Sequence, residues 1–114
     1  RKMTTFEEVI KRAASLGLPI AKDQFTKSNK TPLPDLPYLV YLSEEQQRGD
    51  DTRNRLRQIS GSLELYTERR ADPELEARVE KEVLFDIEFR KYQAQIQQED
   101  TVQTAYEFEI LQKK

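Results

Sequence analysis

The polar stretch from residue 43 to 57 carries the densest group of side chains that could do chemistry. Arg53, Arg55 and Arg57 lie two residues apart, so an extended backbone would place them on one face, with Arg48 nearby. Such a row of guanidinium groups could bind phosphates. The arginines could instead pair with the acidic residues of the same stretch: Glu44, Glu45, Asp50 and Asp51. We favour ion pairing in a solvated loop, because no aromatic side chain lies between the arginines to stack on bases.

Asp50 and Asp51, together with Glu64, are the carboxylates that could form a hydrolytic site. Two adjacent aspartates lack the alternating ligand spacing of a calcium loop, and the chain contains no histidine and no cysteine. Most general-base, nucleophilic and metal-hydrolytic sites use one of these two residue types. We therefore predict a protein that is not an enzyme and that holds no metal and no cofactor.

The composition indicates one domain spanning residues 1–114, with a modest core and a highly charged surface. Apolar residues make up 36% of the chain and charged residues 35%, and the net charge is −2. A charge so near zero does not favour general attraction to nucleic acid or to an anionic membrane. We expect no membrane-spanning segment and no secretory signal, because no apolar run is long enough. Arg1 and Lys2, which precede Met3, are left out of the fold prediction.

The most strongly patterned stretch runs from residue 58 to 84 and predicts a strand followed by a helix. Ile59, Gly61, Leu63 and Leu65 alternate with polar residues, which is typical of a half-buried strand. The helix is expected to start at Asp72, which can cap it before a proline at the first helical position. Its apolar residues recur every fourth position, and we expect it to end near residue 86: they are Leu75, Val79 and Val83.

Another helix is predicted at the beginning of the chain. Thr5 and Glu8 have the spacing of a capping box, and Gly17 is suited to end the helix. Its apolar stripe is expected to pack on the domain's own sheet rather than on a partner: Phe6, Val9, Ile10, Ala13 and Leu16. Residues 20–36 contain several prolines and predict an ordered segment without regular structure.

Three further strands are predicted. The continuous apolar run 38–42, which includes Tyr38 and Tyr41, indicates a strand covered on both faces or placed at a subunit contact. Residues 88–97 predict a strand with imperfect alternation, and residues 102–110 predict one with clear alternation. Residues 98–101 should form the turn between them, and residues 112–114 should fray.

The resulting order, αββαββ, predicts an α+β domain. We expect a two-layer sandwich in which an antiparallel or mixed four-stranded sheet carries two helices on one face. The long polar loop covers about residues 43–57, and its residues 44–56 should be the most mobile internal segment of an isolated subunit and become ordered on assembly.

Several segments together resemble the tail-completion proteins of long-tailed, non-contractile bacteriophages and prophages, also called tail terminators or tail-to-head joining proteins. The segments are Leu16-Gly17-Leu18-Pro19, Pro37-Tyr38-Leu39-Val40-Tyr41, Leu63-Glu64-Leu65-Tyr66-Thr67 before Asp72-Pro73, and Ala105-Tyr106-Glu107-Phe108-Glu109-Ile110. The resemblance covers roughly residues 4–111. The stretch Leu84-Phe85-Asp86-Ile87-Glu88-Phe89 is less typical of the family.

The resemblance implies a non-enzymatic structural protein of the virion, made in the bacterial cytoplasm and located where tail meets head. Such proteins cap the tail tube, join it to the head connector and assemble as a homo-hexameric ring. Their partners are the tail tube protein and the head-connector protein, with no membrane and no specific nucleic acid. The isolated chain could be a monomer. We expect the contact residues at Tyr38, Tyr41, Glu44, Glu45, Arg48, Asp50, Asp51, Arg53 and Arg55. The alternative is a small nucleic-acid-binding α+β module using the arginine-rich loop.

Overall fold

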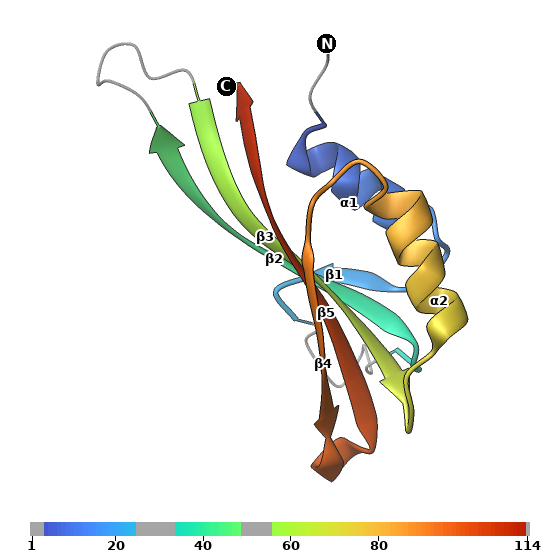
Figure 1. Cartoon of the computed structure of the whole chain (residues 1–114). Helices are drawn as coiled ribbons and strands as arrows, with labels where there is room; N and C mark the ends of the chain where they lie inside the picture. Colours follow the sequence, from blue (N-terminus) through green and yellow to red (C-terminus); the bar gives the residue numbers. More distant parts are fainter. Residues whose placement is uncertain (1–3, 25–33, 49–55, 114) are drawn as a thin grey trace.

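The computed structural model describes residues 4–24, 34–48 and 56–113, which form an α+β fold around one mixed sheet (Figure 1). Five strands lie in the order β1-β2-β3-β5-β4. Their bounds are β1 Ile20–Lys22, β2 Tyr38–Arg48, β3 Leu56–Glu68, β4 Arg90–Ile96 and β5 Thr101–Lys113. All neighbouring pairs are antiparallel except β1 and β2, which are parallel. The sheet is therefore mixed, which was one of the two predicted alternatives; the other was a purely antiparallel sheet.

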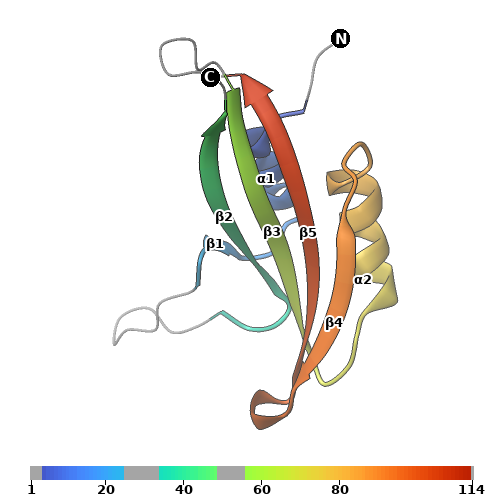
Figure 2. The same ribbon diagram turned by 60° about the vertical axis from the view of Figure 1, so that its left-hand side comes forward.

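Both helices lie on the same face of the sheet, and Figure 2 views the molecule with α1 behind the strands. Helix α1 spans Phe6–Ala14, and helix α2 spans Pro73–Arg78 and continues as a π-helical turn over Val79–Val83. The core lies between these two layers. Its fully buried side chains include Val9 from α1, Leu63 and Leu65 from β3, Val79 and Val83 from the second helix, and Tyr106 from β5. The predicted alternation of β3 and the predicted packing of α1 on the chain's own sheet are confirmed.

The helix starts also agree with the sequence. The Thr5 hydroxyl accepts from the Glu8 N–H at 3.2 Å, and Glu8 Oε1 accepts from the Thr5 N–H at 2.9 Å, which completes a capping box. The Asp72 carboxylate accepts from the Leu75 N–H at 3.1 Å. Gly17 has a φ of +88°, a conformation that most side chains disfavour, and it follows the end of α1 as predicted.

Two expectations about the strands were wrong. Residues 20–22 form a strand, β1, so the sheet has five strands in the described residues rather than four. The predicted polar loop at 43–57 is too long, because β2 continues to Arg48 and β3 starts at Leu56. The hydrogen-bond ladder between β2 and β3 does not stop at residue 42 but continues to Arg48, because backbone hydrogen bonds need no apolar side chains. Residues 49–55 lie outside the described part of the chain, and so do residues 25–33 of the segment expected to lack regular structure.

The predicted fraying of the C-terminal end is also wrong for Gln112. Strand β5 pairs with β3 as far as Lys113, and Gln112 is 5% exposed. Its side-chain amide accepts from the Phe6 N–H at 2.8 Å and donates to Glu7 at 3.2 Å. These bonds satisfy a free N–H group in the first turn of α1 and tie the first helix to the last strand.

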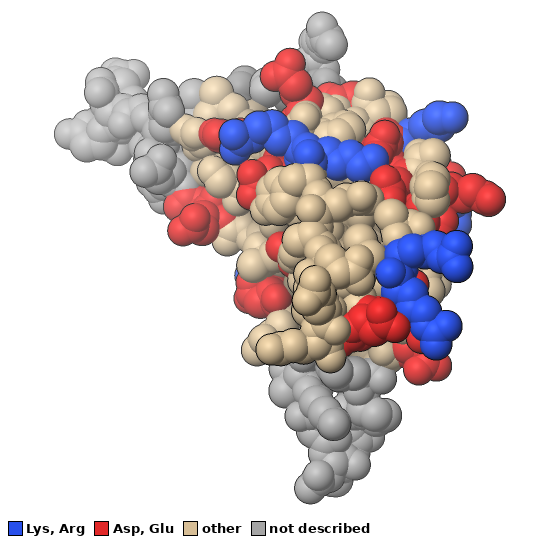
Figure 3. Space-filling view, turned by 60° about the horizontal axis from the view of Figure 1, so that its bottom comes forward, with Lys and Arg blue, Asp and Glu red and all other residues tan. Residues whose placement is uncertain are grey.

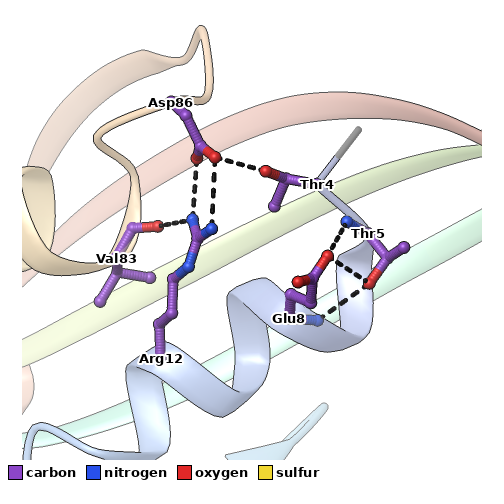
Figure 4. A network of polar contacts seen from close by, with 6 residues as sticks. All are labelled: Thr4, Thr5, Glu8, Arg12, Val83 and Asp86. Carbon is purple, nitrogen blue, oxygen red and sulfur yellow. Dashed lines mark hydrogen bonds and ion pairs between the residues drawn. The ribbon is translucent and has the colours of Figure 1, made fainter. Parts of the chain in front are cut away.

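A second polar contact fixes the helices to each other (Figure 4). The Arg12 guanidinium on α1 donates to both carboxylate oxygens of Asp86, at 2.8 and 3.2 Å, and to the Val83 carbonyl at 3.1 Å. The Thr4 hydroxyl also donates to Asp86. A bidentate arginine–carboxylate pair has a defined geometry, so this contact holds the turn after the second helix against α1.

Candidate functional site

The face of the sheet turned away from the helices carries the most prominent group of exposed and half-exposed functional side chains. We call it the open face. It consists of alternate residues on four strands, because side chains on a strand point to opposite sides in turn. The strand register places these residues on it, of which Val40 and Ala105 are buried and the others are exposed or half-exposed: Tyr38, Val40, Leu42 and Glu44 of β2; Ser60, Ser62, Glu64 and Tyr66 of β3; Gln103, Ala105, Glu107 and Glu109 of β5; and Arg90, Tyr92 and Ala94 of β4.

Tyrosine rings occupy the part of the open face near the start of β2 and the end of β3. The rings of Tyr38 and Tyr66, cross-strand partners, lie with centroids 5.3 Å apart. The Tyr66 hydroxyl donates to Glu64 at 2.9 Å and accepts from Gln103 at 3.0 Å. Burial, followed by the bond to Glu64, raises the pKa of Tyr66 above its ordinary value. This hydroxyl therefore stays protonated and serves as a hydrogen-bond donor, as expected for a recognition surface.

The third tyrosine of the open face lies on the edge strand β4. The Tyr92 side chain is 49% exposed, and its hydroxyl donates to Glu107 at 3.0 Å. That bond is the main reason why the pKa of Tyr92 is raised. Arg90 pairs with the same carboxylate at 3.3 Å. Glu107 thus joins β5 to β4 across the open face.

A trough of about 980 Å³ runs across the middle of the open face. Leu42, Ser60 and Ser62 contribute to its lining. Its charged lining residues are Asp23, Glu44, Glu88, Glu107 and Glu109, which are acidic, and Arg90, which is basic. Five acidic residues against one basic residue make this trough a poor phosphate-binding surface and a suitable one for a Lys- or Arg-bearing partner.

The structure separates the residues that the sequence analysis grouped as contacts. Tyr38 and Glu44 lie on the open face, whereas Tyr41 and Glu45 lie on the helix-covered side, opposite Leu63 and Ile59. They alternate because residues 38–48 form one strand, which the sequence analysis divided into a strand and a loop. The ladder assigns Arg48 to β2. The remaining contact residues lie outside the described residues: Asp50, Asp51, Arg53 and Arg55.

Of the proposed phosphate-binding arginines, Arg57 is the one whose side chain the structure describes, and it is held in ion pairs. Its Nε lies 2.7 Å from Glu45 Oε2, and its Nη2 lies 3.9 Å from Glu7. The Glu45 hydrogen bond is the main reason why the pKa of Arg57 is raised. This pairing agrees with the interpretation that we favoured for the arginines of this stretch. Figure 3 shows one face of the molecule, where basic and acidic side chains lie next to each other around an uncharged area.

A second polar cluster lies between α2 and β4, on the helix-covered side. Lys91 Nζ lies 2.7 Å from Glu76 Oε1 and 2.7 Å from Glu80 Oε2. The Tyr106 hydroxyl donates to Glu80 at 3.0 Å, and the Gln93 amide donates to Glu76 at 2.7 Å. Two carboxylates, a lysine and a tyrosine in contact are a combination also found in active sites.

The protonation states of this cluster indicate a structural role. The Lys91 hydrogen bond lowers the pKa of Glu80, whereas burial opposes that shift. Burial alone would lower the pKa of Lys91, but the bonds to Glu76 and Glu80 raise it overall. Burial, followed by Glu80, raises the pKa of Tyr106. Glu80, Lys91 and Tyr106 are thus held in their ordinary charge states at neutral pH, whereas catalytic acids and bases usually have a pKa moved towards neutrality. The cluster fastens β4 to the second helix.

Neither the open face as a unit nor this polar cluster was evident from the sequence. The polar alternation of β3 and β5 was visible, but the sequence does not show that β5 lies between β3 and β4. In the described residues, no group of three or more His, Cys, Asp or Glu side chains could hold a metal ion. No helix there has the length and apolar character needed to cross a bilayer.

Comparison of the sequence with protein-family models and with curated proteins found no match. The site therefore rests on the geometry of the chain itself.

Proposed function

We propose that this chain is a non-enzymatic assembly protein of a phage virion, which caps the tail tube and joins it to the head connector. The open face carries the proposal. It is four strands wide, it presents tyrosine rings and carboxylates, and both helices pack on the opposite side of the sheet. A protein that acts by docking needs such a surface, enriched in aromatic side chains and rimmed by polar groups.

The resemblance noted in the sequence adds the virion role. Three of its quoted segments lie within β2, β3 and β5, except for Pro37, which precedes β2; one lies at the start of α2, and Leu16-Gly17-Leu18-Pro19 lies between α1 and β1. Tyr38, Glu64, Tyr66 and Glu107 belong both to those segments and to the open face. Within this proposal the head connector or the tail tube offers a basic surface to the trough. The assembled form is a homo-hexameric ring.

Complementation of a gene deletion tests the proposal. The deletion should leave heads and tails unjoined and lower the titre of infectious particles. A double variant, Glu44→Arg with Glu109→Arg, should fold but fail to restore the titre, because it places two positive charges in the trough. A second double variant, Glu74→Arg with Glu82→Arg, makes the same charge change on the exposed side of the second helix. It should restore the titre.

The outcomes separate the parts of the proposal. Normal titre in the deletion strain would contradict the virion role. If the open-face variant is folded, as judged by circular dichroism, and still restores the normal titre, the open face is not the docking surface. The virion role itself would not be contradicted by that result. The nucleic-acid alternative predicts binding to duplex or single-stranded DNA that weakens steeply with salt. Such binding, lost on replacing Arg53 and Arg55, would support that alternative instead.

A further inference from the structure

The trough on the open face has an unbalanced charge that the described part of the chain does not neutralise. Of its charged lining residues, Arg90 and Glu107 pair with each other at 3.3 Å. The others are carboxylates that form no ion pair within the described residues: Asp23, Glu44, Glu88 and Glu109. Carboxylates gathered along one hollow repel one another, and a cationic partner would relieve that repulsion.

The centre of the trough has short side chains between its carboxylates. Ser60 and Ser62 follow one another on the open face of β3, and both line the trough. The ladders place Glu109 of β5 and Glu44 of β2 on either side of Ser60. The two glutamates therefore leave the sheet about 10 Å apart, which is twice the spacing between neighbouring strands. Because the serine side chain is short, the space between the two glutamates is open to a group from a partner.

The width of this space favours a guanidinium over an ammonium. Charge-assisted N–H···O bonds measure about 2.7–2.9 Å, so a single ammonium nitrogen bridges two carboxylate oxygens that are at most about 6 Å apart. A guanidinium donates from three nitrogens in one plane and reaches farther on both sides. Serine hydroxyls below it are additional hydrogen-bond acceptors. The excess of negative charge disfavours phosphate and other anions in the same place.

The chain already places one guanidinium beside this space. Arg90 of β4 is the cross-strand partner of Glu107, and Glu107 in turn is the partner of Ser62. The Arg90 side chain is 86% exposed, and the Tyr92 hydroxyl donates to the other oxygen of the same carboxylate at 3.0 Å. A pair as exposed as Arg90 and Glu107 adds little to stability. Arg90 should instead repel a second cation that enters the trough.

We propose that the trough binds an arginine side chain of a partner protein, with the guanidinium above Ser60 and between Glu44 and Glu109. The inference rests on the proposed docking function of the open face and names the side chain by which the partner is recognised. Charge complementarity selects a cation, and the separation of the two glutamates selects arginine. Lysine is the weaker ligand.

Titration of the isotope-labelled chain with short peptides tests the inference by nuclear magnetic resonance without a known partner. A capped Gly/Ser peptide that carries two arginines should shift the amide signals of Ser60, Ser62 and Glu109. The same peptide with lysines should bind roughly three- to tenfold more weakly. With citrulline, the neutral analogue of arginine, it should not bind. The inference is overturned by an absence of shifts up to about 10 mM arginine peptide, by shifts centred elsewhere, or by equal or tighter binding of the lysine peptide.

Two double variants of equal net charge separate the trough from general attraction. Glu44→Gln with Glu109→Gln should weaken binding of the arginine peptide roughly tenfold, as expected for losing two exposed ion pairs. Glu74→Gln with Glu82→Gln removes two carboxylates from the exposed side of the second helix and should bind like the wild type. Circular dichroism should show that both variants are folded. Equal weakening in the two variants would mean that the peptide is attracted to the whole chain, and the inference would then be wrong.

Arg90→Gln gives the opposite prediction. It removes the cation that lies beside the proposed site, so the arginine peptide should bind roughly threefold more tightly or better. Binding no tighter than that of the wild type would contradict the position that we assign to the guanidinium.

Complementation separates this inference from the virion role. If the gene deletion lowers the titre but the arginine peptide does not bind, the virion role stands and the arginine site is wrong. If the peptide binds as predicted but the deletion leaves the titre normal, the virion role is wrong and the trough is an arginine-binding surface for another protein.

Discussion

Gly61 should tolerate an added methyl group poorly, and Gly61→Ala tests how α1 packs on the sheet. A Cβ at Gly61 would lie 2.6 Å from Cε1 of Phe6 and 3.0 Å from Cε1 of Phe108. Neither ring can swing away freely, because Phe6 is 7% exposed and Phe108 is 5% exposed. Helix α1 must therefore shift outward, or a ring must leave its rotamer.

The expected magnitude follows from two opposing effects. Glycine inside a strand is less favourable than alanine by roughly 0.5–1 kcal/mol, so the substitution would stabilise the fold if the space were open. Overpacking a close-packed core costs about 1–3 kcal/mol. Since the nearest approach is well inside van der Waals contact, the clash should win, and we expect net destabilisation of about 1–2 kcal/mol.

Urea unfolding followed by circular dichroism measures this change as a lower midpoint with an unchanged slope. Ser60→Ala is the control: the adjacent side chain is exposed on the open face, so the variant should stay within about 0.5 kcal/mol of the wild type. Adding Phe6→Leu to Gly61→Ala should cost less than the sum of the single changes, because the shorter side chain leaves room for the methyl group. A Gly61→Ala variant as stable as the wild type would refute the reasoning.

Three further predictions concern the core, the helix contact and the polar cluster. Leu63→Ala should lower the free energy of unfolding by roughly 2–5 kcal/mol, because Leu63 is fully buried, and a loss below about 0.5 kcal/mol in urea unfolding would contradict the strand register. The hydrogen bonds from Arg12 lower the pKa of Asp86 in the folded state, so their stabilising contribution should be complete above the ordinary aspartate pKa of about 3.9 and be lost as the pH falls below it. Asp86→Asn should remove this part of the acid dependence of the thermal midpoint, and an unchanged acid profile would contradict the assignment. Lys91→Met should destabilise the fold by roughly 1–3 kcal/mol, because Glu76 would keep a nearly buried charge with the Gln93 amide but without its cationic partner, and Lys91→Met combined with Glu76→Gln should recover part of the loss in the same unfolding assay.

Much of the fold could be predicted because its apolar residues follow clear periods. The alternation around Leu63, the helix start at Asp72 and the capping box at Thr5 each have a local physical cause, and each is confirmed. Strand β1 was missed because three residues carry no period, and its pairing with residues 39–41 is decided by tertiary contacts. The outer half of β2 was taken for a loop because polar side chains on both faces erase the alternation signal, although backbone hydrogen bonds still form.

The candidate site could be predicted only in parts. The sequence showed the polar face of β3 and that of β5 separately, through alternating polar residues such as Ser60, Ser62 and Glu64 of β3. Their union into one face depends on strand order, which the sequence does not encode locally.

The position of β5 has a consequence for synthesis of the chain. This strand is the last of the five to leave the ribosome, yet it pairs with β3 on one side and with β4 on the other. Until it emerges, β3 lacks one neighbour and β4 has none among the described strands, so the nascent sheet exposes unpaired backbone groups. The last strand also supplies Gln112, which caps the first turn of α1. Folding should therefore be completed late and as one step, and emergence of β5, rather than emergence of the first hairpin, should set the time at which a protease-resistant domain forms.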